Sequence, residues 1–387
     1  MRFFLVLLVA GVFSSTYVQA QAIKVGALLP LSGPQARVGA VQRVALEASI
    51  QALRSAGVTL ELTLLDSYNP DDAGDAAVQA AALVDSGAHV LICCNTKEEA
   101  AQLASLAAAA NVPLLTLSAP LEVSPTSAVG GAAGGDAYWV FSLAAEETAS
   151  LGLLLLEPAL HPVGLMAPVG RSGDHAGILL EPIRNAVVRY PERSDLPLTP
   201  EALLLATREP ASVVLWAESE GTVRGAEALA ARGYSGDIIV RSSVWEELGA
   251  LERARLTGAK SVVSPALLGY TLADTHPSKA AVSSFRRSLI ALPDGLLERT
   301  ALAAGAGAWD AALLIGRAAE QVLAYGPAPT EPSTLRSALR DTLVGLGPIT
   351  GAGGLYNFSG GGEGWDGLDP GSLVLAVWRG GRFRPIP

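Results

Sequence analysis

Short apolar runs alternate with longer stretches of helical spacing along most of this chain. The first apolar run covers 23–29. The stretch after it repeats apolar residues at spacings of three and four, at Val41, Val44, Ala45, Ala48 and Ala52. This spacing predicts an amphipathic helix. Strands that alternate with helices in this way form βαβ units around a parallel sheet, so we expect an α/β fold.

The alternation runs through two consecutive cycles, separated by a glycine-rich stretch at 130–136. In the first cycle we expect strands at 23–29, 59–65, 89–93 and 113–117, with helices from Asp71 onward and over 97–110. In the second we expect helices at 145–156, 174–188 and 221–232, with strands at 163–167, 213–216 and 237–240. Two such cycles predict two lobes of similar build.

The last third of the chain has a different pattern. We expect helices at 278–290, 301–323 and 333–343, then a glycine-rich segment at 347–367 and a final strand at 372–378. Helices without strands between them are suited to covering sheets that are already built. The chain is therefore expected to cross between the lobes more than once.

The first twenty residues have the composition of a secretory signal peptide. Arg2 gives a positive start, 3–12 is an apolar run, and Val18-Gln19-Ala20 is a small-residue cleavage site. The alternative is a membrane anchor, but the run is shorter than the roughly 20 apolar residues that span a bilayer. We expect cleavage after Ala20 and a periplasmic or secreted mature chain, long enough for two domains.

The amino-acid composition indicates the kind of hydrophobic core that the protein forms and the partners that it can bind. Half of the residues are hydrophobic but only 5% are aromatic, which favours helices packed on sheets over an aromatic-rich β-sandwich. The net charge of −10 argues against nucleic acid, which requires a basic face. The two cysteines, Cys93 and Cys94, are adjacent. Either they form a vicinal disulfide in an oxidising compartment, or they are two small buried residues at a strand end.

A search for enzyme motifs finds little. The four histidines are scattered, with no pair at metal-ligand spacing, and there is no Gly-x-Ser-x-Gly or Walker A sequence. We therefore expect no catalytic residue, no metal and no cofactor.

The strand-to-helix turns are the candidate binding loops, because ligands bind at the carboxyl ends of strands in open α/β sheets. These turns are 30–39, 95–97, 118–120, 168–174, 217–221 and 241–246. Thr96 followed by Glu99 matches a capping box, which predicts Thr96 as the N-cap of a helix. Helix N-termini also bind carboxylates, and Lys97 adds a positive charge, whereas Glu98 and Glu99 oppose it. A plain capped helix and a ligand contact both remain open here.

Several short sequences follow one another in a specific order along the chain. They are Ile23-Lys24-Val25-Gly26, Pro30-Leu31-Ser32-Gly33-Pro34, Gly39, Asp66-Ser67-Tyr68-Asn69-Pro70, 93–97, 112–119, Ala308-Trp309-Asp310-Ala311 and 351–360 with Phe358-Ser359 inside it. In this order the chain resembles the type I periplasmic binding proteins of branched-chain amino acid ABC importers, over essentially the whole mature chain.

The resemblance implies two Rossmann-like lobes joined by three hinge crossovers, with the ligand between them. Lobe I would comprise 21–140 plus 268–345, and lobe II 141–267 plus 346–387. The polar stretch 189–200 stands where an apolar strand is expected, so lobe II is expected to be trimmed there. The resemblance also implies a monomer that closes on its ligand and docks on an ABC permease in the inner membrane.

The resemblance places a binding site on both lobes. In the family, the ligand's carboxylate meets a serine-type residue at the position that matches Thr96 or Lys97, and backbone at the position that matches Ser118 and Ala119. The sequence departs from the family where a hydroxyl near Pro120, an aromatic residue near Val38, tyrosines at Ser172 and Ser219 and an ammonium-binding carboxylate near Ser243 are expected. The candidate ligand-binding residues are Val38, Asn95, Thr96, Lys97, Ser118, Ala119, Pro120, Ser172, Glu218, Ser219, Ser243 and Glu246.

These departures bear on the ligand. A buried ammonium without an acceptor is costly, so either Glu218 or Glu246 reaches the ligand or the ligand is not an α-amino acid. We expect an amino acid, an amide or a related carboxylate. Two other functions remain open: a ligand sensor for a signalling partner, and a secreted α/β hydrolase, which would need a histidine beside Ser172 or Ser118.

Overall fold

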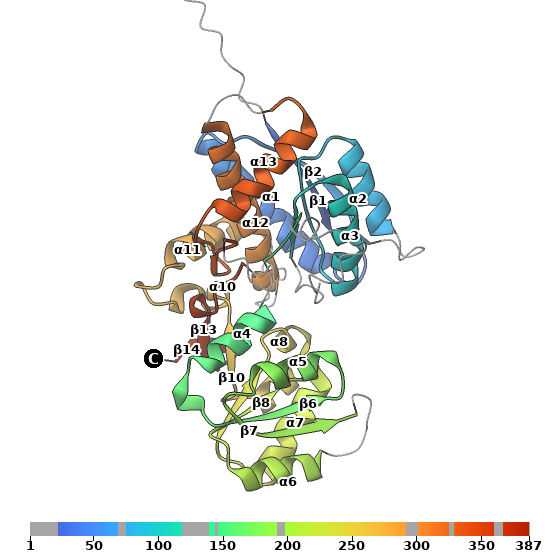
Figure 1. Ribbon diagram of the computed structural model, residues 1–387. Coiled ribbons are helices and arrows are strands. Elements are labelled where there is room, and N and C mark those ends of the chain that lie inside the picture. Colours follow the sequence, from blue (N-terminus) through green and yellow to red (C-terminus); the bar gives the residue numbers. More distant parts are fainter. Residues whose placement is uncertain are drawn as a thin grey trace, which may run out of the picture.

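The computed structural model describes residues 22–68, 75–117, 139–143, 146–191, 198–291, 301–324, 329–359 and 367–386. In these residues the strands form two separate main sheets, one in each of two lobes, and helices cover both (Figure 1). The signal peptide expected at 1–20 lies outside the described residues. Among the helices that are described, none is both long enough and apolar enough to cross a membrane.

The first sheet, in the upper lobe of Figure 1, is entirely parallel. Its strands are β1 Ile23–Leu29, β2 Leu60–Asp66, β3 Val90–Cys93, β4 Leu114–Thr116 and β5 Val140–Ser142, in the order β2-β1-β3-β4-β5. Its helices are α1 Ala36–Ser55 on one face, and α2 Asp75–Asp85 and α3 Lys97–Ala110 on the other. Every residue of β3 and β4 is buried, because parallel sheets have helices on both faces.

The second sheet has seven strands in the order β14-β13-β10-β9-β8-β6-β7. They are β6 Val163–Pro168, β7 Arg184–Tyr190, β8 Ser212–Leu215, β9 Asp237–Val240, β10 Lys260–Val263, β13 Val374–Arg379 and β14 Arg382–Pro385. The strands from β7 to β10 are parallel, and β13 and β14 add an antiparallel edge. The surrounding helices are α4 Glu146–Leu155, α5 Arg171–Leu179, α6 Thr199–Arg208, α7 Ser219–Ala231, α8 Val244–Glu247 and α9 Ala250–Arg255.

Helices from the last third of the chain return to the first sheet. They are α10 Pro265–Leu268, α11 Lys279–Ser288, α12 Ala301–Ala324 and α13 Pro332–Gly345. α12 lies along α1, where the Ser49 hydroxyl donates a hydrogen bond to the carbonyl of Trp309 at 3.0 Å. α13 packs on α12, and its Arg336 donates to the carbonyl oxygens of Ala88 at 2.8 Å and Ala110 at 3.3 Å. These helices cover the first lobe, as their pattern predicted.

The chain crosses between the lobes three times. It passes from β5 to α4, from β10 to α10, and from a small hairpin to β13. The hairpin is formed by β11 Ile349–Thr350 and β12 Leu355–Tyr356. β5 extends the first sheet two residues past the lobe boundary expected at residue 140.

Asp310 of α12 binds the hairpin of the third crossover, and Ser264 joins that hairpin to the second crossover. The fully buried carboxylate of Asp310 accepts hydrogen bonds from the backbone N–H groups of Ala352 and Gly353, both at 2.7 Å, and from the Tyr356 hydroxyl at 3.0 Å. The Ser264 hydroxyl, at the start of α10, donates to the Gly353 carbonyl at 3.0 Å. Burial raises the pKa of Asp310 to about 7, although the three hydrogen bonds lower it.

Two expectations about the second lobe are wrong. The helix expected at 174–188 ends at Leu179, and its second half is β7. Lobe II therefore keeps an edge strand, although it was expected to be trimmed after Val188. β7 lies at the end of the sheet, where one side is open to solvent, so it mixes polar residues such as Arg184 and Arg189 with apolar ones. The apolar residues Leu179, Ile183 and Val187 are four apart, which imitates helical spacing.

Candidate functional site

The carboxyl ends of both parallel sheets point toward the other lobe. In the first sheet, the chain leaves the carboxyl end of β5, at Ser142, for α4 in the second lobe. In the second sheet, it leaves the carboxyl end of β10, at Val263, for α10, which contacts α11 and α12. The strand-to-helix turns of the two lobes therefore face one another, and this edge is where ligands bind in α/β sheets.

The turn between β3 and α3 forms the centre of the first half-site. Thr96 is the N-cap of α3, and its hydroxyl accepts a hydrogen bond from the Glu99 N–H at 3.2 Å. The Glu99 carboxylate in turn accepts from the Asn95 N–H at 3.0 Å. This reciprocal pair confirms Thr96 as the predicted cap. Because Glu99 already satisfies a backbone donor, the turn is held in one conformation before any ligand arrives.

Gln42 of α1 holds the side chain of Asn95. The two amides form a reciprocal pair, with Gln42 Nε2 to Asn95 Oδ1 at 2.6 Å and Asn95 Nδ2 to Gln42 Oε1 at 3.3 Å. Gln42 is fully buried. Sequence reasoning missed it, although a glutamine between Val41 and the apolar positions of the same helix face was a visible signal. The pair fixes the side chain of Asn95 against α1, just after the carboxyl end of β3.

The vicinal cysteines lie immediately before this turn. Cys93 and Cys94 are both buried and are joined by a disulfide bond. Cys94 has a φ of 78°, in the left-handed region that residues other than glycine rarely adopt. The disulfide thus coincides with the point where β3 ends and the candidate binding turn begins.

Asp66 organises the neighbouring loop after β1. Its Oδ1 accepts hydrogen bonds from the N–H groups of Leu31 at 2.8 Å, Ser32 at 3.3 Å and Tyr68 at 3.0 Å. Burial favours a higher pKa for Asp66, but hydrogen bonds from the Ser32 side chain and these N–H groups outweigh it and lower the pKa. Val38 follows this loop, half-buried in the first turn of α1.

Part of the expected first half-site falls outside what the structure describes. Ser118, Ala119 and Pro120 are in this group, as are the side chains of Lys97 and, in the second lobe, Glu246. The residues that the structure does bring together on the first lobe are Gln42, Asn95, Thr96 and Glu99.

The second half-site is built around Trp216, at the carboxyl end of β8. Trp216 is buried, and its indole Nε1 donates a hydrogen bond to the Ser172 hydroxyl at 3.0 Å. The guanidinium of Arg241, at the end of β9, lies 5.1 Å from the centre of the indole ring. Arg241 Nη1 also forms an ion pair with Glu218 Oε1 at 3.3 Å. Three adjacent strand ends thus contribute one connected cluster.

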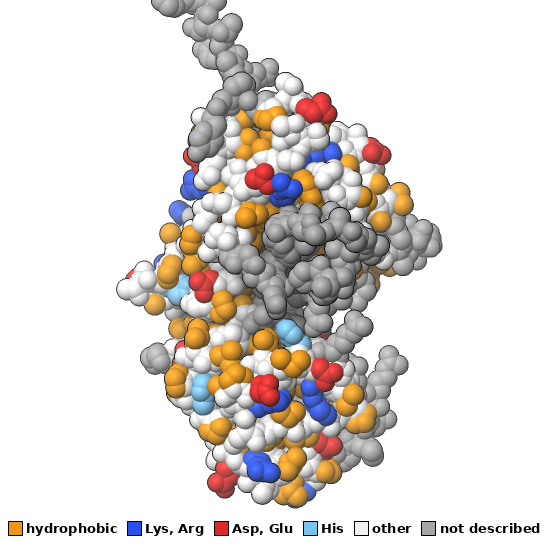
Figure 2. Space-filling model, viewed as in Figure 1, with side chains coloured by type: hydrophobic (Ala, Val, Ile, Leu, Met, Phe, Trp, Pro, Cys, Tyr) orange, Lys and Arg blue, Asp and Glu red, His pale blue; other side chains and the backbone are white. Residues whose placement is uncertain are grey.

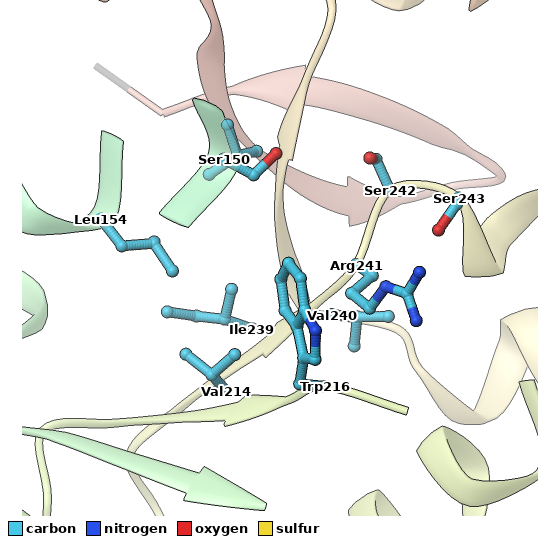
Figure 3. Close-up of a pocket in the computed structure, with 10 residues that line it drawn as sticks. Ser150, Leu154, Val214, Trp216, Ile239, Val240, Arg241, Ser242 and Ser243 are labelled. Carbon is cyan, nitrogen blue, oxygen red and sulfur yellow. The ribbon is translucent and has the colours of Figure 1, made fainter. Parts of the chain in front are cut away.

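A small pocket opens beside this cluster. Figure 3 shows the Trp216 ring between two kinds of surface. Leu154, Val214 and Ile239 lie on one side, and Arg241, Ser242 and Ser243 lie on the other. The pocket therefore combines an apolar wall with a positively charged, hydroxyl-bearing end.

The remaining predicted residues of lobe II are distributed around this pocket. Ser243 lines it, Ser219 is the first residue of α7, and Glu218 precedes that helix with 63% of its side chain exposed. Trp216 and Arg241 were missed as candidates. The available signal was their position, because each directly follows the apolar run of a strand at the ligand-binding edge.

The distribution of charge gives no sign of a metal or polyanion site. Among the described residues, no group of three or more His, Cys, Asp or Glu side chains could hold a metal ion. Figure 2 shows acidic and basic side chains interspersed over both lobes, and no basic stripe crosses the described part of this face.

In comparisons with known proteins, the chain is similar to periplasmic binding proteins and extracellular ligand-binding receptors. A family model described as periplasmic binding protein matches residues 22–160. No match was found among curated proteins. The fold is similar to an extracellular ligand-binding receptor from Rhodopseudomonas palustris, with a TM-score of 0.68 and 19% identity, over 95% of this chain and 100% of that one.

Two similar structures contain ligands. One is an ABC transporter substrate-binding protein from Desulfitobacterium hafniense in complex with Leu, with a TM-score of 0.67 and 16% identity, over 95% of this chain and 100% of that one. The other is an R. palustris solute-binding protein in complex with benzoate, with a TM-score of 0.58 and 18% identity, over 95% and 96% of the two chains.

Proposed function

We propose that this chain, which has the fold of type I periplasmic binding proteins, is an extracytoplasmic solute receptor that traps a small ligand between its lobes. It catalyses no reaction in this proposal, and it delivers its ligand to an ABC importer in the inner membrane. The expected signal peptide and the match of 22–160 to the periplasmic binding protein family support the location. A ligand sensor for a signalling partner would use the same binding step.

The observation that carries this proposal is the opposition of two incomplete sites. The first lobe presents Asn95 and Thr96 at the end of β3. The second presents Trp216 and Arg241 at the ends of β8 and β9. Each set belongs to one sheet, and crossover segments join the two lobes. A ligand that contacts both sets binds the closed form more tightly than the open one, and that difference in affinity drives closure.

The ligand class follows from similar reasoning. Micromolar affinity corresponds to about 8 kcal/mol, which a small molecule reaches with a few polar contacts and a buried apolar part. The similar structures bind leucine and benzoate, which share a carboxylate and an apolar body. We infer a ligand of the same general kind, an amino acid, an amide or a related carboxylate.

A thermal-shift screen of the purified protein against amino acids, amides and carboxylates tests the receptor role. A ligand at ~100 times its dissociation constant adds about 2.7 kcal/mol to the free energy of unfolding. We expect at least one chemical class to raise the unfolding temperature and the others to leave it unchanged. No shift with any member of a broad library would contradict the proposal.

A further inference from the structure

Arg241 is the one described cation that lines the pocket of the second half-site. Only 10% of its side chain is exposed, and its guanidinium carbon lies 5.1 Å from the centre of the Trp216 ring. Trp216 is itself fixed by its hydrogen bond to Ser172. An arginine that stacks on an aromatic face is held in one orientation, and it is better suited to this arrangement than a lysine because its cation is planar.

We propose that Arg241 determines the specificity of the second half-site and selects ligands with a carboxylate attached to an apolar body, without requiring an ammonium group. This proposal rests on the receptor role proposed above. A guanidinium matches a carboxylate in shape and can bind it with two parallel hydrogen bonds. Leu154, Val214 and Ile239, on the other side of Trp216, belong to the buried core of the second lobe. The apolar body of the ligand is inferred from the leucine and benzoate that the similar structures hold.

Charge at this end of the pocket disfavours an ammonium. A ligand ammonium placed next to Arg241 would meet a like charge in a site that is partly shielded from water, where repulsion is strong. The sequence led us to expect an acceptor for an ammonium near Ser243. The charged residue that lines the pocket beside it is instead a cation, Arg241, which is paired with Glu218.

The Glu218 carboxylate is one of the groups that interact with this cation. It lies 3.3 Å from Arg241 Nη1, but 63% of the Glu218 side chain is exposed. An exposed carboxylate gains little from such a pair, because water competes for it. A ligand carboxylate that is shielded by the closing lobes can therefore replace Glu218 beside Arg241.

Two matched series of ligands test the proposal by titration calorimetry. The aromatic series is phenylacetate, phenylacetamide, 2-phenylethylamine and phenylalanine, and the aliphatic series is 4-methylpentanoate, its amide, isopentylamine and leucine. In at least one series we expect the simple carboxylate to bind ~30-fold or more tightly than its amide, and the amine not to bind. Equal affinity for carboxylate and amide would overturn the proposal, as would no binding of either carboxylate.

Substitution of Arg241 provides the second arm. Arg241→Gln should weaken binding of the carboxylate by about 30-fold or more but leave binding of the amide within a few-fold. Arg241→Lys keeps the charge and loses the planar guanidinium. Its affinity for the carboxylate should lie between those of the wild-type protein and Arg241→Gln. The control is Arg232→Gln, at the exposed far end of α7, which should bind as wild type. If Arg241→Gln keeps the wild-type preference for the carboxylate, the proposal is wrong.

Different results would contradict the receptor role and the proposed specificity of Arg241. If leucine or phenylalanine binds while the simple carboxylates do not, and Glu218→Gln abolishes that binding, the receptor role stands and the specificity proposal is overturned. If no compound in the broad screen binds, the receptor role itself fails. Circular dichroism of each variant shows whether a loss of binding reflects a loss of folding.

Discussion

The half-sites of the two lobes are built in opposite ways. The first is a hydrogen-bonded network in which Gln42, Asn95, Thr96 and Glu99 satisfy one another and the backbone. The second places a cation on an aromatic ring, with an exposed carboxylate as its partner. The hydrogen bonds described for the first network lie within one lobe. The charge of the second is suited to a group that the ligand supplies.

This contrast separates two tasks. A network that is already satisfied fixes the shape of a surface, and its loss should weaken all ligands alike. A stacked arginine recognises one kind of charge, and its loss should weaken only ligands that carry it. The following substitutions test this division, and they are ordered by the size of the expected effect on stability.

Substitution of Asp310, which binds the hairpin between the lobes, should lower stability most. Asp310→Asn replaces one carboxylate oxygen by an NH2 group, which faces the donors of Gly353 and Tyr356 or of Ala352. We expect a loss of about 3 kcal/mol in the free energy of unfolding, measured with denaturant at pH 6. Asp341→Asn, on the exposed surface of α13, is the matched control. A loss as small as that of the control would show that the hydrogen bonds of Asp310 add nothing to the free energy of unfolding.

The same residue predicts a dependence on pH. The folded-state pKa of Asp310, about 7, is higher than the value of 3.8 for an unperturbed aspartate. Between these two values the folded protein therefore binds more protons than the unfolded chain, and the contribution of Asp310 to stability falls as the pH rises. The difference in unfolding free energy between wild type and Asp310→Asn should shrink from pH 4 to pH 7. A difference that grows over this range would contradict the raised pKa.

The amide pair of the first half-site should come next. Gln42→Leu leaves the Asn95 side chain without its partner in a partly buried position, and we expect a loss of about 2 kcal/mol. Binding of carboxylates and amides should weaken by a similar factor, unlike the selective effect of Arg241→Gln. Gln51→Leu, on the exposed side of the same helix, should change stability by less than about 0.5 kcal/mol. If Gln42→Leu weakened the binding of carboxylates but not of amides, the distinction between the half-sites would be wrong.

The helix cap should have a smaller effect. Thr96→Ala removes the acceptor for the Glu99 N–H, and we expect a loss of about 1 kcal/mol in thermal or denaturant unfolding. Thr96→Ser keeps the hydroxyl and should retain most of the stability. If the two variants unfold alike, the cap does not order this turn.

Glu218→Gln should change stability least. It should strengthen the binding of carboxylates, whereas Arg241→Gln should weaken it. The exposed ion pair with Arg241 contributes under about 1 kcal/mol. Because its loss removes a competitor for Arg241, affinity for simple carboxylates should rise a few-fold in calorimetric titrations. Glu220→Gln, in the first turn of the helix that Glu218 precedes, should leave affinity unchanged. A weaker affinity in Glu218→Gln would assign this carboxylate to the ligand rather than to Arg241.

Local patterns in the sequence predicted much of the fold. β1, α3 and β9 begin and end at the residues expected, because each has a strong period or a clear cap. β7 was mistaken for helix, since an edge strand is only half covered and its apolar residues happened to lie four apart. β10, at Lys260–Val263, was not predicted, although it is as long as β9.

The candidate site was predicted only where its interactions are local. Thr96 and Glu99 are three residues apart, so a capping box revealed them. The pairs Gln42 with Asn95 and Ser172 with Trp216 are separated by 53 and 44 residues, and no local pattern indicates such partners. Arg241 was overlooked because only the folded sheet places the end of β9 beside the end of β8.

Small-angle X-ray scattering, with and without a ligand from the thermal-shift screen, tests the central claim most directly. If the ligand is held by groups from both lobes, its binding should reduce the radius of gyration of the wild-type protein. A ligand that binds tightly while the radius of gyration stays unchanged would show that one lobe alone holds it, and the account of two cooperating half-sites would be wrong.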